Sequence, residues 1–160
     1  MALIYESENF FVESVEKPHV DRDEGGHIII RPKVRILDRQ KLSPKKAIEL
    51  MRLTIIVGEA MAKVMNNHGV DIGRINYQDN GNWSVFKPEG PYLHIHIYGR
   101  AKSAKVNKYG DAIIMCHREE APDHYANMKP LAKEDIKDIR IEIKKLLMDQ
   151  KFLNSEWGLS

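Results

Sequence analysis

The sequence of 160 residues contains a single cysteine, Cys116, and no hydrophobic run long enough to cross a lipid bilayer. One cysteine excludes a disulfide bond within the chain, and the absence of disulfides is typical of proteins from a reducing compartment. The first residues, MALIYESENFF, lack the basic and apolar regions of a secretory signal peptide. We therefore expect a cytoplasmic protein that has no membrane partner.

A strong net charge is also missing. The chain has 25 Lys and Arg against 23 Asp and Glu, and the formal net charge of +2 does not by itself indicate binding to nucleic acid. The hydrophobic fraction of 42% is typical of a soluble globular protein. Since no repeat or long linker divides the chain, we predict one domain over residues 1–160, with a core at about 10–118 and a helical extension at about 130–152.

The clearest helix signal begins at Ser43. This residue suits an N-cap and Pro44 suits the first helical position, while Gly69 suits the end of a helix. Apolar residues recur between them at three- and four-residue steps, which predicts a helix over residues 44–68. Its methionines at positions 51, 61 and 65 are interpreted as core filler. A second helix is predicted over residues 134–151, because acidic residues begin it and isoleucines form its stripe.

Strands are predicted where apolar residues alternate or cluster between turn signals. Gly25-Gly26 is a hairpin signal between the first two strands, and Asn80-Gly81 is a turn signal after the third. Cys116 is expected to be buried in the last strand. The predicted strands cover residues 10–15, 27–37, 70–79, 83–86, 90–100 and 111–119. Short connections between them favour an antiparallel sheet with helices packed on it, and therefore an α+β fold.

The most informative segment is GPYLHIHIYGR, residues 90–100. Because alternate side chains of a strand point to opposite faces, this segment predicts one aliphatic face and one face with two imidazoles. His94 and His96 would lie about 7 Å apart on that second face. Arg100 would place a fixed positive charge near them. The aliphatic face consists of Leu93, Ile95 and Ile97, and the other face of Tyr92, His94, His96 and Tyr98.

Two histidines on one face can carry out nucleophilic chemistry. A neutral imidazole attacks phosphorus through its unprotonated nitrogen, so the other ring nitrogen should donate its proton to a fixed acceptor. A second imidazole and an arginine can stabilise the charge that grows on the phosphoryl oxygens. Two alternatives remain open from the residues alone. The pair can be a structural or chance surface pair, or it can bind zinc or copper with His27 or His117 as a third ligand.

The histidine strand resembles the signature of the histidine triad (HIT) family of nucleotide hydrolases and transferases, His-φ-His-φ-His-φ-φ, where φ is an apolar residue. In one register Tyr92 replaces the first histidine, and His94 and His96 are the middle and third. In the other register His94 is the first. We prefer the former, because it keeps every apolar position of the signature. It also places Arg100 where the family often has an arginine after the signature. GGHIIIRPK and INYQDNG are similar to two further family segments, so the resemblance covers about residues 10–102.

The resemblance implies a HIT-like antiparallel sheet with a long helix packed on it. It also implies a hydrolase or nucleotidyl transferase that attacks the α-phosphorus of a nucleoside 5′-phosphoryl compound, either a dinucleoside polyphosphate such as diadenosine polyphosphate or a nucleoside phosphoramidate. His94 would form a covalent intermediate with the nucleotide, and His96 would contact phosphate. The resemblance further implies a homodimer, with no cofactor required, although a divalent cation can accompany a polyphosphate substrate. The expected substrate-binding residues are Gln78, Tyr92, Arg100 and His27.

The sequence departs from the family pattern at two positions near the nucleophile. Tyr92 replaces the first histidine, and Glu89 lies five residues before His94, where many relatives carry a Ser or Thr that donates to the leaving group. A carboxylate at this position would repel a phosphate leaving group. The alternative function is therefore a nucleotide-binding protein with weak or no catalysis. The ribose contact is left open among Glu13, Ser14 and Glu16.

Overall fold

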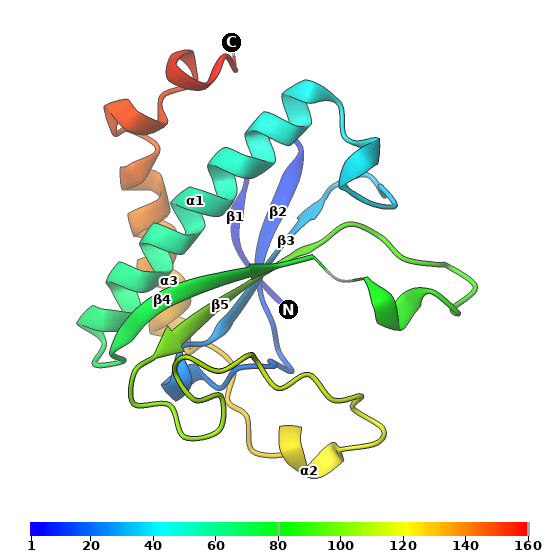
Figure 1. The fold of residues 1–160 in the computed structure, drawn as a ribbon. Helices are drawn as coiled ribbons and strands as arrows, with labels where there is room; N and C mark the ends of the chain where they lie inside the picture. The colour runs from blue at the N-terminus through cyan, green and yellow to red at the C-terminus, as the bar shows by residue number, and fades with distance from the viewer. Residues whose placement is uncertain (80, 160) are drawn as a thin grey trace.

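The computed structural model describes residues 1–79 and 81–159, with only the backbone given for Asn82. Its centre is a five-stranded sheet in the order β1-β2-β3-β5-β4, in which every neighbouring pair is antiparallel (Figure 1). The α+β prediction is therefore confirmed. The strands are β1 (Ala2–Glu6), β2 (Phe10–Ser14), β3 (His27–Pro32), β4 (Ile72–Gln78) and β5 (Ile95–Ala101).

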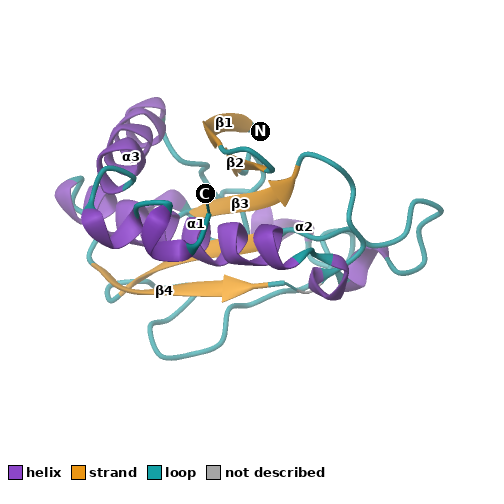
Figure 2. Cartoon of the chain, turned by 90° about the horizontal axis from the view of Figure 1, so that it is seen from above, coloured by secondary structure: helices purple, strands orange, loops and turns teal. Residues whose placement is uncertain are grey.

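The predicted long helix is confirmed as α1 (Pro44–Asn67). The Ser43 hydroxyl accepts a hydrogen bond from the Lys46 amide at 3.4 Å, and Gly69 has a φ of +84° just after the C-cap. Figures 1 and 2 show α1 crossing one face of the sheet, with α3 (Lys133–Leu146) beside it. A short helix, α2 (Pro122–Tyr125), lies in the segment that follows β5.

The core lies between the sheet and α1. The aliphatic face of β5 is buried as predicted, and Ile28 and Ile30 of β3 are completely buried beside it. Met61 and Met65 fill the core beneath α1, whereas the prediction for Met51 is wrong, since 56% of its surface is exposed. Each fully buried aliphatic side chain contributes about 2 kcal/mol to folding, so this layer fixes which face of β5 is turned inward.

The C-terminal helix joins the same core, because Ile139 and Ile143 of α3 are fully buried against it. The helix ends at Leu146 and not at residue 151 as predicted. Asp149 then accepts a hydrogen bond from the Lys151 amide and begins the 3-10 turn η4 (Gln150–Phe152). This turn buries Phe152, which explains why the chain leaves the helix early.

Two predicted strands are wrong. Residues 83–86 belong to no strand; the 3-10 turn η3 (Asn82–Ser84) lies there, and Phe86 is fully exposed. Residues 111–119 form an irregular segment in which Ile113 is buried but Ile114 is 45% exposed. Neither apolar run pairs with a strand of the sheet, so tertiary structure overrides its β propensity. The turn predicted at Asn80-Gly81 falls partly outside the described residues.

One strand was not predicted, and one connection differs from the expected hairpin. β1 pairs with the outer edge of β2. Between β2 and β3 the chain makes the 3-10 turn η1 (Arg22–Glu24) before the two glycines. Gly25 has a φ of +134°, and a Cβ there would collide with the backbone of Gly99 in β5. This close approach brings the connection, and with it His19, against the polar face of the sheet.

Candidate active site

Four imidazoles gather on the face of the sheet opposite α1. The strand pairing places His27 of β3 opposite Tyr98 of β5. The centroid of the His27 ring lies 5.0 Å from the centroid of the His96 ring. The ring of His94 lies 4.6 Å from His96 on the other side. His19, from the connection between β2 and β3, lies 6.0 Å from His96. The predicted same-face arrangement of His94 and His96 is thus confirmed, and two further histidines join it.

His94 lies just before β5 and not within a strand, which differs from the prediction for residues 90–100. The segment is fixed by other contacts, because the Leu93 amide donates to the Ile36 carbonyl at 2.7 Å. Arg35 donates to the carbonyl of Gly90 at 2.8 Å and also to those of Glu89 and Pro91. These contacts position the His94 ring without a strand partner.

The tautomer of His94 follows from its contacts. Its Nδ1 lies 2.9 Å from the backbone carbonyl oxygen of Tyr92, which can only accept a hydrogen bond. Nδ1 therefore carries the proton, and Nε2 keeps a free lone pair. This is the arrangement that a nucleophilic imidazole requires.

The tautomers of His27 and His96 follow in the same way. The His19 backbone amide donates to His27 Nδ1 at 3.3 Å, so neutral His27 carries its proton on Nε2. That nitrogen lies 2.8 Å from His96 Nδ1 and donates to it. Neutral His96 must then carry its proton on Nε2. A chain of hydrogen bonds thus fixes His96 as a donor, next to the bare Nε2 of His94.

The environment keeps these rings neutral. Burial lowers the pKa of His96 to about 3, and the neighbouring His94 and His19 lower it further in the same direction. Burial also lowers the pKa of His27 well below its usual value, with His96 as the second cause. The pKa of His19 falls to about 4, first through burial and then through the charge of Arg118. All three are therefore uncharged at neutral pH, as the hydrogen-bond chain requires.

This neutrality predicts a loss of stability in mild acid. An unfolded histidine has a pKa near 6.5, so below that pH the unfolded chain binds protons that the folded chain excludes. The free energy of unfolding should fall by up to about 1.4 kcal/mol per pH unit for each histidine as the pH drops from 6.5 to 5. Thermal unfolding measured across this range checks the prediction. His19→Gln should reduce the slope, and an unchanged slope would contradict it.

The histidines line a cavity of about 430 Å³. Lys17, Lys87 and Arg118 also line it, and none of its described lining residues carries a carboxylate. Trp83 forms an aromatic wall, with its ring 5.3 Å from that of His19. A cavity with several cations, no carboxylate and an aromatic surface suits a ligand that combines an anionic group with a planar ring.

The structure brings together four of the six predicted site residues, namely His27, Tyr92, His94 and His96. Arg100 lies elsewhere: it is 5% exposed and donates to the Asn76 side chain and to three carbonyls of residues 107–111. Its charge stabilises the loop after β5 and does not face the histidines. Gln78 pairs with His96 across the sheet, but it lines cavities at the outer strand β4 and not the histidine cavity.

Several solved structures have a fold similar to that of this chain. A histidine triad nucleotide-binding protein from Sulfolobus tokodaii, described as hypothetical, has 18% identity and a TM-score of 0.57, with 91% of this chain and 85% of that one covered. A HIT-like protein from Bartonella henselae has 15% identity and a TM-score of 0.57, with 88% and 85% covered. A zinc-bound histidine triad family protein from Mycobacterium smegmatis has 17% identity and a TM-score of 0.57, with 90% and 84% covered.

The chain has the histidine triad fold. The sequence itself matches no family model and no curated protein. The likeness is therefore one of architecture, and it agrees with the resemblance of the histidine strand. Within residues 1–79 and 81–159, no helix is long and apolar enough to cross a membrane.

In this chain with the histidine triad fold, the histidine cavity also has lining residues that were not predicted from the sequence. They lie in irregular segments, where no periodic pattern marks a side chain as facing a cavity. Their residue types gave the only available signal, since three are cations and two are aromatic or imidazole rings. The missed residues are Lys17, His19, Trp83, Lys87 and Arg118.

The three residues considered for a ribose contact lie outside the lining of this cavity. Glu13 is occupied by Arg31, which donates to its two carboxylate oxygens at 2.6 and 3.0 Å. Glu16 lies 3.4 Å from the N-terminal amine of Met1. Cys116 is half-buried in the loop after β5, and not buried in a strand as expected.

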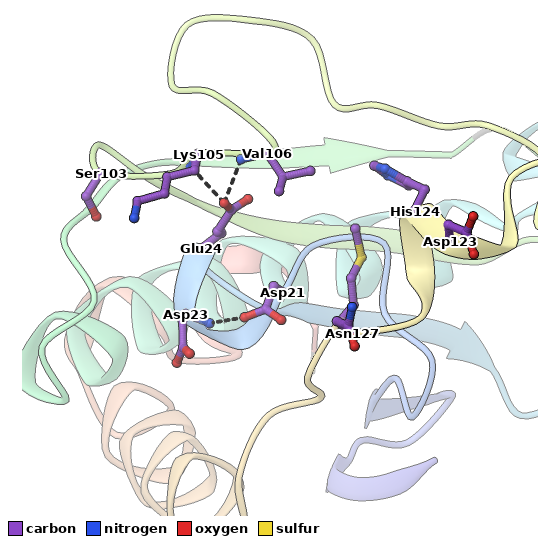
Figure 3. A pocket seen from close by; sticks show the side chains of 10 residues that line it. Asp21, Asp23, Glu24, Ser103, Lys105, Val106, Asp123, His124 and Asn127 are labelled. Carbon is purple, nitrogen blue, oxygen red and sulfur yellow. Dashed lines mark hydrogen bonds between the residues drawn. The ribbon is translucent and has the colours of Figure 1, made fainter.

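A second cavity, of about 610 Å³, shares no lining residue with the histidine cavity and is lined by several carboxylates (Figure 3). Glu24 accepts hydrogen bonds from the backbone amides of Lys105, Val106 and Asn107 at 2.7–2.9 Å. Asp21 accepts from the amides of Asp23 and Lys129. These carboxylates stabilise the loop after β5. In the described part of the chain, no group of three His, Cys, Asp or Glu side chains is arranged to bind a metal ion.

Proposed function

We propose that the protein is a hydrolase or nucleotidyl transferase that attacks the α-phosphorus of a nucleoside 5′-phosphoryl compound. His94 is the nucleophile. The observation that carries the proposal is the hydrogen bond from His94 Nδ1 to the Tyr92 carbonyl, which leaves Nε2 bare at a cavity lined by cations. The choice of a nucleotide is supported by the structural neighbour from Sulfolobus tokodaii, which is described as a histidine triad nucleotide-binding protein.

The reaction has two displacement steps. His94 Nε2 attacks the α-phosphorus, the N–P bond forms, and the leaving group departs with the electron pair of its former bond to phosphorus. Water, or an acceptor hydroxyl in a transfer reaction, then attacks the phosphorus and loses its proton to solvent. The N–P bond breaks and its electron pair returns to Nε2. The Nε2–H of His96 stabilises the phosphoryl oxygens in both steps. The scheme requires no metal, and a divalent cation accompanies the substrate only when that substrate is a polyphosphate.

The two departures from the family pattern are compatible with this mechanism. Tyr92 acts on His94 through its backbone carbonyl, so the contact that fixes the nucleophile does not depend on the Tyr92 side chain. Glu89 is exposed, and it is its backbone carbonyl that accepts from Arg35. Glu89 is not a lining residue of the cavity. Because solvent screens its exposed carboxylate, it repels an anionic leaving group only weakly.

A direct assay distinguishes turnover from binding alone. The protein is incubated with dinucleoside polyphosphates and nucleoside phosphoramidates, and the products are separated by anion-exchange chromatography. Release of a nucleoside monophosphate supports the hydrolase. Nucleotide binding by calorimetry without any product supports the second candidate, a nucleotide-binding protein without useful catalysis. Glu89 favours this candidate, because a Ser or Thr hydroxyl that would donate to the leaving group is missing there.

We also propose a homodimer, in which a second copy covers the surface formed by α1 and the outer strand β4. Met51 and Tyr77 on this surface are 56% and 48% exposed, and a largely apolar groove lies between them. Met51→Glu should convert the dimer to a monomer while leaving the fold intact, because the side chain is not in the core. Light scattering of both proteins checks this prediction. A wild-type monomer at micromolar concentration would contradict it.

A further inference from the structure

Arg118 has no role in the resemblance, because it lies in the segment after residue 102. The structure nevertheless brings it into the lining of the histidine cavity, together with His94 and His96. Among the described lining residues it is the one guanidinium, since Arg100 faces a different cavity. The fixed positive charge that the sequence analysis expected from Arg100 is thus supplied from another segment of the chain.

Contacts on two sides fix the guanidinium of Arg118. Its Nη2 donates to the Lys17 carbonyl at 2.6 Å and reaches the Pro18 carbonyl at 3.4 Å. Its central carbon lies 4.2 Å above the ring of Tyr125. No described residue accepts a hydrogen bond from its Nε or Nη1, so these N–H groups remain available to a ligand. The side chain is held in place before any ligand binds.

The other cationic side chains of the cavity are not held in place in this way. Lys17 and Lys87 are exposed, so solvent screens their charges and their long side chains keep their rotamer freedom. The field of Arg118 reaches the imidazoles, because its charge contributes to the lowered pKa of both His19 and His27. A planar guanidinium also matches a phosphoryl group better than an ammonium does.

We infer that Arg118 binds the phosphoryl group that His94 attacks, and so acts as the phosphate anchor of the site. This inference rests on the proposed function. Arg118 neutralises the negative charge of the non-bridging oxygens, which otherwise repels an incoming lone pair. The bare Nε2 of His94, the Nε2–H of His96 and the free N–H groups of Arg118 then surround one phosphorus.

The test compares nucleotides with nucleosides, because the two ligands differ only in the phosphate. Calorimetry measures the affinity of the protein for the four common ribonucleoside 5′-monophosphates and for the matching nucleosides. Arg118→Gln should weaken the best-bound monophosphate about ten- to hundredfold, the size expected for lost charged hydrogen bonds, and change nucleoside affinity less than twofold. Arg118→Lys should give a smaller loss, because it keeps the charge.

The matched control is Arg140→Gln. Arg140 also donates to two backbone carbonyls, those of Ile4 at 2.9 Å and Leu3 at 2.7 Å, but it lies on α3 and away from the cavity. The Arg140→Gln variant should have unchanged affinity for both the monophosphates and the nucleosides. An equal loss of nucleotide and nucleoside affinity in Arg118→Gln would reduce Arg118 to a structural residue and overturn the inference. Undiminished monophosphate affinity would also overturn it, while the proposed function would survive. A wild-type protein that binds no nucleotide would overturn both.

Discussion

His94→Ala is expected to lower kcat/KM for release of the nucleoside monophosphate by about 10³-fold or more, while the protein stays folded. The reason is chemical. Without Nε2, no N–P bond can form, and water must displace the leaving group in one step without a covalent intermediate. The substitution removes a half-buried ring at the cavity wall and no core contact, so circular dichroism and thermal unfolding should change little.

The covalent intermediate gives the sharper measurement. Wild-type protein mixed with substrate and stopped in alkaline denaturant should gain the mass of one nucleotidyl group, because a phosphorus–nitrogen bond survives base better than acid. His94→Ala should gain none. His96→Asn is the matched variant: it removes the donor to the phosphoryl oxygens but leaves the nucleophile, so it should slow turnover about 10²- to 10³-fold and still form the adduct. A nucleotidyl adduct on His94→Ala would rule out this mechanism.

Sequence periodicity was sufficient for the parts of the site that lie on regular structure. Alternation along β5 predicted which face carries His96 and which face carries Ile95 and Ile97. The caps at Ser43 and Gly69 predicted both ends of α1. In each case the deciding contacts are local, so a short stretch of sequence contains them.

The rest of the site depends on contacts between distant segments. His19 reaches the cavity because Gly25 and Gly99 approach closely, 74 positions apart in the chain. Arg118 reaches it because the carbonyls of Lys17 and Pro18 accept its hydrogen bonds. No residue type or spacing encodes such meetings in a single sequence. The same reason explains the wrong prediction for Arg100. The motif suggested that Arg100 lies beside the histidines, but its hydrogen bonds to three backbone carbonyls hold it elsewhere.

The connection that carries His19 is itself anchored by a buried carboxylate. Asp135, at the start of α3, is 1% exposed. Arg22 of η1 donates to both of its oxygens, at 2.9 and 2.8 Å, and the Ala132 amide donates at 2.8 Å. The Nδ1 of His68, at the end of α1, lies 2.7 Å away. One side chain therefore joins η1, α1 and α3.

Asp135→Ala is expected to destabilise the protein by about 3 kcal/mol, because it removes the buried acceptor of two Arg22 N–H groups and of the Ala132 amide and leaves Arg22 only the exposed Asp23 as an ion-pair partner. For a chain of this length that loss lowers the midpoint of thermal unfolding by about 6–12 °C. Asp138→Ala is the matched control, because Asp138 contacts His68 at 3.0 Å but is 43% exposed. An exposed ion pair of this kind contributes less than about 1 kcal/mol. Equal stability losses in the two variants would contradict the prediction.

The pH dependence of this cluster separates it from the histidine cavity. Burial alone would raise the pKa of Asp135, but hydrogen bonds from Arg22 and His68 lower it to about 2. The part of its contribution that depends on its own ionisation is therefore complete above pH 4 and is lost as the pH falls toward 2. Its hydrogen bond also raises the pKa of His68, and that part of the contribution is fully present below pH 6.5. The cavity histidines destabilise the fold between pH 6.5 and 5, where Asp135 stays ionised. Asp135→Ala should thus lower stability by a similar amount at pH 6.5 and at pH 5, whereas His19→Gln should change the slope between them, and chemical denaturation at these two pH values measures both.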